Sequence, residues 1–236
     1  MGRAFEFRKA RKFKRWSAMS KTFTKLGKEI SLAVKAGGPD PTTNGRLRAV
    51  IQNAKAVNMP KDNVESAIKK ASNKDEKAMD EIVYEGIGPG GVAMMVETAT
   101  DNPNRTVANL RVIFSRNGGA LGNSGSVSFQ FERKGVFEFP ADGINIEELE
   151  LELIDFGAQE ISVDEGVVYV ETDFVDFAGM QKALEERKIP ITTAELQRIA
   201  TSYKEGLTDE VREELEILLE KLEEDDDVQN VFHNMA

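Results

Sequence analysis

The sequence contains no cysteine and only one histidine, His233. The absence of cysteine excludes disulfides, thiolate metal sites and cysteine nucleophiles, and a single histidine cannot build a multi-histidine metal centre. No serine is evidently placed for His233 to activate, so we interpret it as a structural residue. We therefore predict a protein that is not an enzyme and has no catalytic residues, no cofactor and no metal site.

Long apolar runs are also missing. None approaches the ~20 residues that cross a bilayer, and the first residues lack the continuous apolar segment of a signal peptide. We predict a cytoplasmic monomer without membrane contact. An alternative stays open, because the arginine-rich, acid-poor start also resembles an organellar transit peptide.

Charge is divided unevenly along the chain. The formal net charge is −10, yet residues 1–80 hold 19 Lys and Arg against 8 Asp and Glu, a net charge of +11. Residues 81–236 hold 12 against 33, a net charge of −21. Clustered cations on one module are typical of proteins that neutralise nucleic-acid phosphates. The run at residues 223–227 is interpreted as solvated charge, because consecutive carboxylates do not converge on a cation.

The basic half begins with an arm at residues 1–19. If this arm is helical, its cations share a face, and Trp16 could stack on an unpaired base. The alternative is that the aromatic residues only attach the arm to the helices that follow. The candidate nucleic-acid contacts of the arm are Arg8, Arg11, Lys12, Lys14 and Arg15.

Residues 20–80 are predicted to form a basic three-helix domain. In the first helix, Phe23, Leu26 and Ile30 fall on one face. The opposite face carries a lysine row, which consists of Lys21, Lys25, Lys28 and Lys35. Thr43 or Asn44 can cap the second helix, and Lys61 pairs with Glu65 on the third. A one-sided lysine face is typical of a nucleic-acid-binding surface, but it is also typical of an ordinary solvated surface. Both interpretations are kept.

The acidic half opens with Gly86, Gly88 and Gly91 in the spacing G-x-G-x-x-G. That spacing binds a dinucleotide only where a helix follows and offers its N-terminal N–H groups to the pyrophosphate. Here the apolar segment VAMMVET follows, which predicts a strand. The glycines are therefore interpreted as a turn between two strands.

The remaining segments predict two α/β domains. Residues 134–200 spell β-α-β-β-α-β, the ferredoxin-like order, and they read as an insertion into a middle domain of residues 81–133 plus 201–236. SVSFQF is predicted to be a strand with Val127, Phe129 and Phe131 on its buried side. The predicted fold class is α+β: an N-terminal three-helix domain followed by two α/β ferredoxin-like domains, one inserted in the other.

Five segments resemble, in order, the signature blocks of the YebC family of bacterial and organellar gene-expression regulators. They are FTKLGKEISLAVKAGGPDP, NAKAVNMPKDNVESAIKKA, YEGIGPGGVAMMVETATDNPNRT, RNGGALGNSGSVSFQFERKG and DDDVQNVFHNM. The start differs, because the family commonly opens with Gly-His-Ser-Lys-Trp and only Lys14-Arg15-Trp16 is similar here.

The resemblance implies a non-enzymatic role as a DNA-binding transcriptional regulator or as a ribosome-associated translation factor. A mitochondrial branch of the family activates synthesis of a cytochrome c oxidase subunit. The positive patch of the family's first domain maps onto the lysine row, with Arg46, Arg48 and Lys55 nearby. We therefore predict a regulator that binds DNA or ribosomal RNA. The alternatives are an acidic protein–protein adaptor and a small-molecule-binding α/β protein.

Overall fold

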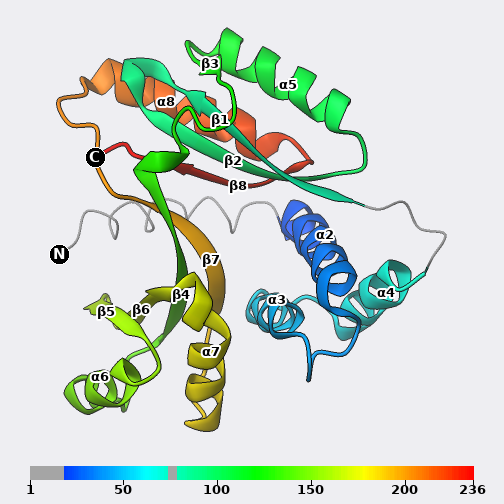
Figure 1. Ribbon diagram of the computed structural model, residues 1–236, viewed down its shortest axis with the longest axis vertical. Helices are drawn as coiled ribbons and strands as arrows, with labels where there is room; N and C mark the ends of the chain where they lie inside the picture. The colour runs from blue at the N-terminus through cyan, green and yellow to red at the C-terminus, as the bar shows by residue number, and fades with distance from the viewer. Residues whose placement is uncertain (1–18, 74–78) are drawn as a thin grey trace. The chain divides into compact units, whose positions relative to one another are not determined.

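The structure is a computed structural model that describes residues 19–73 and 79–236. These residues divide into two compact units. The first contains residues 19–28, 79–132 and 198–236, and the second contains residues 29–73 and 133–197. Each unit has its own four-stranded sheet and its own helices (Figure 1). Every helix in the described part of the chain is too short or too polar to cross a bilayer.

The sheet of the first unit has the strand order β3-β1-β2-β8 with antiparallel pairings throughout. Helices α5 and α8 cover one face of it, as Figure 1 shows. The C-terminal strand thus pairs with the strands that follow the basic half, as the sequence predicted. The elements are β1 (Asp80–Ile87), β2 (Ala93–Thr100), α5 (Pro103–Arg116), β3 (Ala120–Leu121), α8 (Asp209–Glu224) and β8 (Val228–His233).

The core of the first unit lies between this sheet and its two helices. Its strand side chains come from β2 and β8, and its helix side chains follow the apolar stripes of α5 and α8. Asn102 caps α5 and Thr208 caps α8, each by accepting a backbone N–H with its side-chain oxygen. The main contributors to this core are Val92, Met94, Val96, Leu110, Phe114, Leu215, Leu218 and Leu222.

The glycine motif joins β1 to β2 through the short turn η1 (Pro89–Gly91), and no helix follows it. Gly90 has a φ of 67°, a left-handed conformation that favours glycine. A Cβ added at Gly88 would lie 2.8 Å from a methyl of Leu215 and 2.9 Å from the sulfur of Met94. The motif therefore serves a turn and close packing, which confirms its interpretation as a turn.

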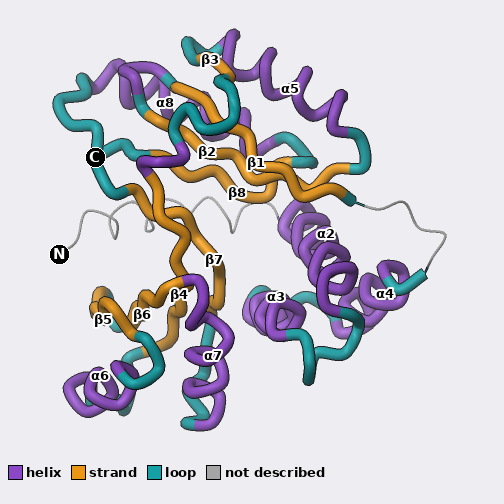
Figure 2. Tube along the Cα trace, in the orientation of Figure 1, coloured by secondary structure: helices purple, strands orange, loops and turns teal. Residues whose placement is uncertain are grey.

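The second unit contains the predicted β-α-β-β-α-β series, with the strand order β5-β6-β4-β7. Helices α6 and α7 pack on this sheet, and Phe137 stacks on Phe177 with ring centroids 4.9 Å apart. Figure 2 shows these strands in orange and the helices in purple. The elements are β4 (Phe131–Pro140), α6 (Ile146–Ile154), β5 (Ala158–Asp164), β6 (Val167–Asp173), η3 (Phe174–Asp176), α7 (Phe177–Glu186) and β7 (Thr193–Ala200).

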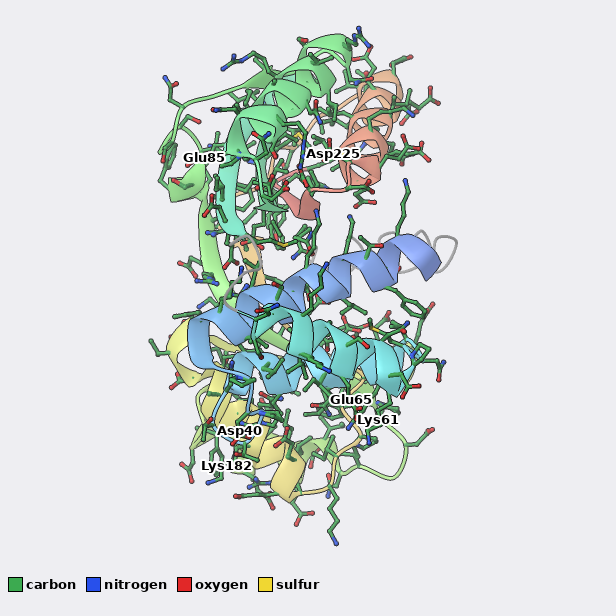
Figure 3. The ribbon with its side chains drawn as sticks, turned by 90° about the vertical axis from the view of Figure 1, so that its right-hand side faces the viewer. Asp40, Lys61, Glu65, Glu85, Lys182 and Asp225 are labelled. Carbon is green, nitrogen blue, oxygen red and sulfur yellow. The ribbon has the colours of Figure 1, made fainter. Side chains whose placement is uncertain are left out.

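Within the described residues, three helices precede the sheets: α2 (Met19–Gly37), α3 (Gly45–Ala56) and α4 (Lys61–Ala71). Asn44 caps α3 by accepting the N–H of Leu47 at 3.0 Å. Lys61 pairs with Glu65 on α4 at 3.3 Å, as predicted (Figure 3). Within the second unit, the side-chain amide of Asn53 donates to and accepts from the backbone of Ala194, both at 2.8 Å. This two-way bond fixes α3 to β7.

The α+β fold class is confirmed, whereas the four-part domain division stays a prediction. One strand prediction is wrong. Residues 128–130 form the 3-10 turn η2 (Ser128–Gln130), and the strand begins only at Phe131. The cause is Glu85, whose carboxylate accepts the N–H groups of Val127 and Ser128 and so draws them away from a strand ladder.

Candidate nucleic-acid interface

The lysine row lies along α2, opposite the buried residues Leu26, Ile30 and Ala33. The two ends of the row are more exposed than its middle. Lys21 and Lys35 are exposed, whereas Lys25 and Lys28 are partly buried. The row therefore has the helical face that the sequence predicted, but its four ammonium groups do not share one environment.

The first two lysines of the row contact the C-terminal end of α8. Lys21 Nζ lies 3.4 Å from the carbonyl oxygen of Glu224, and Lys25 Nζ lies 3.2 Å from that of Glu223. The last carbonyls of a helix have no partner within the helix and carry the negative end of its dipole. These two lysines therefore cap α8 electrostatically.

Lys28 is bound more completely. Its Nζ donates to Asp227 Oδ1 at 2.9 Å, to the carbonyl of Asp226 at 2.7 Å and to the carbonyl of Ala99 at 3.1 Å. An ammonium has three N–H donors, and all three are used here. The Lys28 side chain is only 14% exposed. Its charge therefore serves the fold of the first unit.

Asp227 is the centre of this network. Its Oδ2 accepts from Arg105 Nη2 at 2.7 Å, from the hydroxyl of Thr106 at 2.8 Å and from that of Thr100 at 3.2 Å. Burial alone would raise the pKa of Asp227, but hydrogen bonds from Arg105, Lys28 and Thr106 outweigh it and lower the pKa to about 2. The carboxylate is therefore held ionised.

The interpretation of residues 223–227 as solvated charge is wrong for Asp227, which is 5% exposed. Arg105 was missed by sequence reasoning, because its partner Asp227 lies 122 residues away. The nearer acid, Asp101, accounts for a second bond of the same guanidinium, at 3.0 Å. Neighbouring Asp225 (Figure 3) is the C-cap of α8, and its carboxylate accepts the N–H of Asp227.

The other predicted contacts lie on α3 or outside the described residues. Arg48 pairs with Glu185 at 3.4 Å within the second unit and donates to the carbonyl of Pro41 at 3.3 Å. Lys55 is exposed and Arg46 is partly exposed. The arm residues Arg8, Arg11, Lys12, Lys14 and Arg15 lie outside the described residues.

A second buried carboxylate, Glu85 on β1, shapes the loop that leads to β4. Its two oxygens accept the backbone N–H groups of Gly125, Val127 and Ser128 at 2.7, 2.7 and 2.9 Å. Burial alone would raise the pKa of Glu85, but these bonds outweigh it and lower the pKa below its ordinary value. His233, at 8% exposure, accepts the N–H of Met235 with Nδ1, in keeping with a structural role.

Family models cover almost the whole chain. The TACO1/YebC protein N-terminal domain matches residues 3–74, and the TACO1/YebC second and third domain matches residues 79–235. The chain belongs to the TACO1/YebC family. The resemblance drawn from the sequence is thereby confirmed.

Relatives in the TACO1/YebC family match over their full length. A protein of Flavobacterium johnsoniae is 57% identical over 235 residues, with 100% of this chain and 99% of that protein covered. One from Parabacteroides distasonis is 56% identical, with 100% and 97% covered. Both are named "Probable transcriptional regulatory protein". The crystal structure of a conserved hypothetical protein from Aquifex aeolicus has a TM-score of 0.84 at 40% identity, over 93% of this chain and 90% of that one.

Proposed function

We propose that this protein is a non-catalytic regulator of gene expression that binds nucleic acid through cations of its first 80 residues. The separation of charge carries the proposal: +11 in residues 1–80 against −21 in the remainder. Positive charge concentrated on one module provides the phosphate contacts on which nucleic-acid affinity mainly depends. The naming of full-length relatives as transcriptional regulatory proteins supports the regulatory role.

Contacts within the first unit reduce the number of cations that can bind a phosphate group. Lys28 has all three of its donors occupied, and Lys21 and Lys25 meet carbonyls of α8. Among the cations predicted from the sequence, the phosphate contacts proposed in the described residues are Lys35 and Lys55, which are exposed, and Arg46, which is partly exposed. The basic arm, with Arg8, Arg11, Lys12, Lys14 and Arg15, supplies the others. Arg48 is assigned to the pair with Glu185 instead.

The acidic half has a complementary role in this proposal. With a net charge of −21, it repels the phosphate backbone and directs nucleic acid toward the basic residues. Lysine and arginine contacts to phosphate position a duplex but do not read its bases, and they do not report a 2′-hydroxyl. The proposed ligand is therefore a polyanionic nucleic acid, bound by a cytoplasmic monomer, and DNA and ribosomal RNA are the two candidate sources.

Cross-linking of the full-length protein in cells, followed by sequencing of the attached DNA and RNA, tests this proposal. Recovery of DNA upstream of genes supports a transcriptional role, and recovery of ribosomal RNA supports a role as a translation factor at the ribosome. Attachment to proteins alone would overturn the proposal in favour of the acidic adaptor. In filter binding, the affinity should fall steeply with salt, because bound phosphates release counterions.

A further inference from the structure

The loop at residues 122–130, here called the Phe129 loop, holds an aromatic ring in solvent. Phe129 is 76% exposed, whereas Phe114, Phe137 and Phe139 are fully buried. A single exposed apolar side chain is common on protein surfaces and by itself indicates little. Here, however, hydrogen bonds fix the backbone on both sides of Phe129 and hold its ring in solvent.

Both neighbours of Phe129 are anchored. On one side, the N–H of Ser128 bonds to the buried carboxylate of Glu85 at 2.9 Å. On the other side, the carbonyl of Gln130 accepts the N–H of Thr201 at 2.9 Å, and its side-chain oxygen accepts from Asn234 at 3.0 Å. The turn that points the ring outward is thus built by groups far apart in sequence. Because the loop backbone is already fixed, a ligand that stacks on this ring does not have to order the loop. The entropy cost of binding is therefore small.

The charge around the Phe129 loop also differs from the rest of the acidic half. Residues 81–236 contain 33 Asp and Glu, yet none of them falls between Asn102 and Phe131. Arg111 and Arg116 also belong to this acid-free stretch and are exposed, but they lie on α5, which packs on the opposite face of the sheet from Val127. The loop itself therefore carries no carboxylate that would repel a phosphate backbone.

The Phe129 loop presents one aromatic ring among small, mostly polar residues, a surface that suits a flat, uncharged group. The residues between Leu121 and Val127 are Gly, Asn, Ser, Gly and Ser, which are small and add no further apolar surface. An isolated ring of this kind does not provide the contiguous apolar patch that a protein partner requires. It does suit an unpaired base, because every base offers a face that stacks on an aromatic ring.

We propose that Phe129 is a stacking site for an unpaired base of a bound nucleic acid, held outward by the Glu85 anchor. This inference rests on the proposed function, since the basic residues must first hold the strand. It adds to that function a preference for single-stranded segments, which phosphate contacts alone do not provide.

Fluorescence anisotropy with the full-length protein tests this site, using labelled 12-nucleotide single strands of RNA and DNA and the matching duplexes. Phe129→Ala should weaken binding to single strands about tenfold, the typical loss of one stacked base, and change duplex binding less than twofold. Phe129→Trp should retain the affinity. Leu151→Ala removes a side chain of similar exposure, 72%, from α6 and should change neither affinity.

A spectroscopic readout separates stacking from a general effect on the surface. The chain has one tryptophan, Trp16, so Trp16→Phe combined with Phe129→Trp leaves a single reporter in the loop. Its fluorescence should be quenched by single strands and not by duplexes. Equal quenching by both would overturn the stacking site.

The outcomes also distinguish the two proposals. If the wild-type protein binds neither single strands nor duplexes, the proposed function fails and the stacking site fails with it. If the wild type binds and Phe129→Ala binds single strands equally well, the stacking site is overturned while the proposed function stands. A loss that is the same for single strands and duplexes overturns it as well, and an unchanged melting temperature of Phe129→Ala excludes misfolding as the cause.

Discussion

Two buried carboxylates of the first unit, Asp227 and Glu85, are ionised by different means. Asp227 is surrounded by side chains and forms ion pairs with Lys28 and Arg105. Glu85 takes three backbone N–H groups and no cation among the described residues. Both have a pKa below the ordinary value, so the pKa alone does not reveal the difference.

The comparison shows what each carboxylate does for the molecule. Asp227 forms ion pairs with Lys28 and Arg105, and Lys28 is therefore not proposed as a phosphate contact. Glu85 accepts hydrogen bonds from backbone N–H groups. As a result, a segment with strand-like alternation forms a turn that exposes Phe129. One carboxylate thus limits the proposed phosphate surface, and the other creates the proposed base-stacking site.

The largest expected effect comes from removing Asp227. Asp227→Ala leaves Lys28 poorly solvated and without its ion-pair partner, and it should lower the free energy of unfolding by about 3 kcal/mol. Urea denaturation measures this loss. Asp226→Ala is the matched control, because its exposed side chain precedes Asp227 directly while only its backbone carbonyl accepts from Lys28. The control should stay within about 0.5 kcal/mol of the wild type. Equal effects of the two substitutions would contradict the account of Asp227.

The second effect is a pH dependence. The folded pKa of Asp227 is about 2, below its value of about 3.9 in an unfolded chain. Its ionised form therefore stabilises the fold above about pH 4, and this contribution of about 2.5 kcal/mol is lost as the pH falls toward 2. Urea denaturation across this window should show a smaller decline for Asp227→Asn than for the wild type. An identical decline in both proteins would rule out Asp227 as a source of the acid sensitivity.

The smallest expected change in stability concerns Glu85. Glu85→Gln preserves the size of the side chain but replaces one acceptor oxygen with an NH₂ group, so at least one loop N–H loses its partner. We expect a loss of about 1 to 2 kcal/mol and faster hydrogen exchange at Gly125, Val127 and Ser128, measured by NMR. Glu220→Gln, on the exposed face of α8, should alter neither quantity. Unchanged protection of the three amides would show that Glu85 does not hold the loop.

Local signals in the sequence predicted most of the fold. A cap at Thr43 or Asn44, the turn at Gly88 and the β-α-β-β-α-β series follow from residue types and spacings within a few positions. The structure contains the turn and the series, and it places the cap at Asn44. The series was readable because each of its elements carries its own periodicity.

The contacts that decide the site were not predictable in this way. Lys28 and Asp227 lie 199 residues apart, and helical periodicity gives the face of a lysine without giving its partner. Residues 126–131 alternate as a strand does, but Glu85, 42 residues before Val127, takes the N–H groups that a strand would need. In both cases a distant carboxylate overrides a correct local pattern.

The salt dependence of nucleic-acid binding by the full-length protein tests the central claim most directly. A variant that combines Lys35→Ala, Arg46→Ala and Lys55→Ala should bind more weakly to every sequence. Its slope of log affinity against log salt should be smaller than the wild-type slope by about three units, one for each lost phosphate contact. A slope equal to that of the wild type would contradict the claim that these residues hold the phosphate backbone.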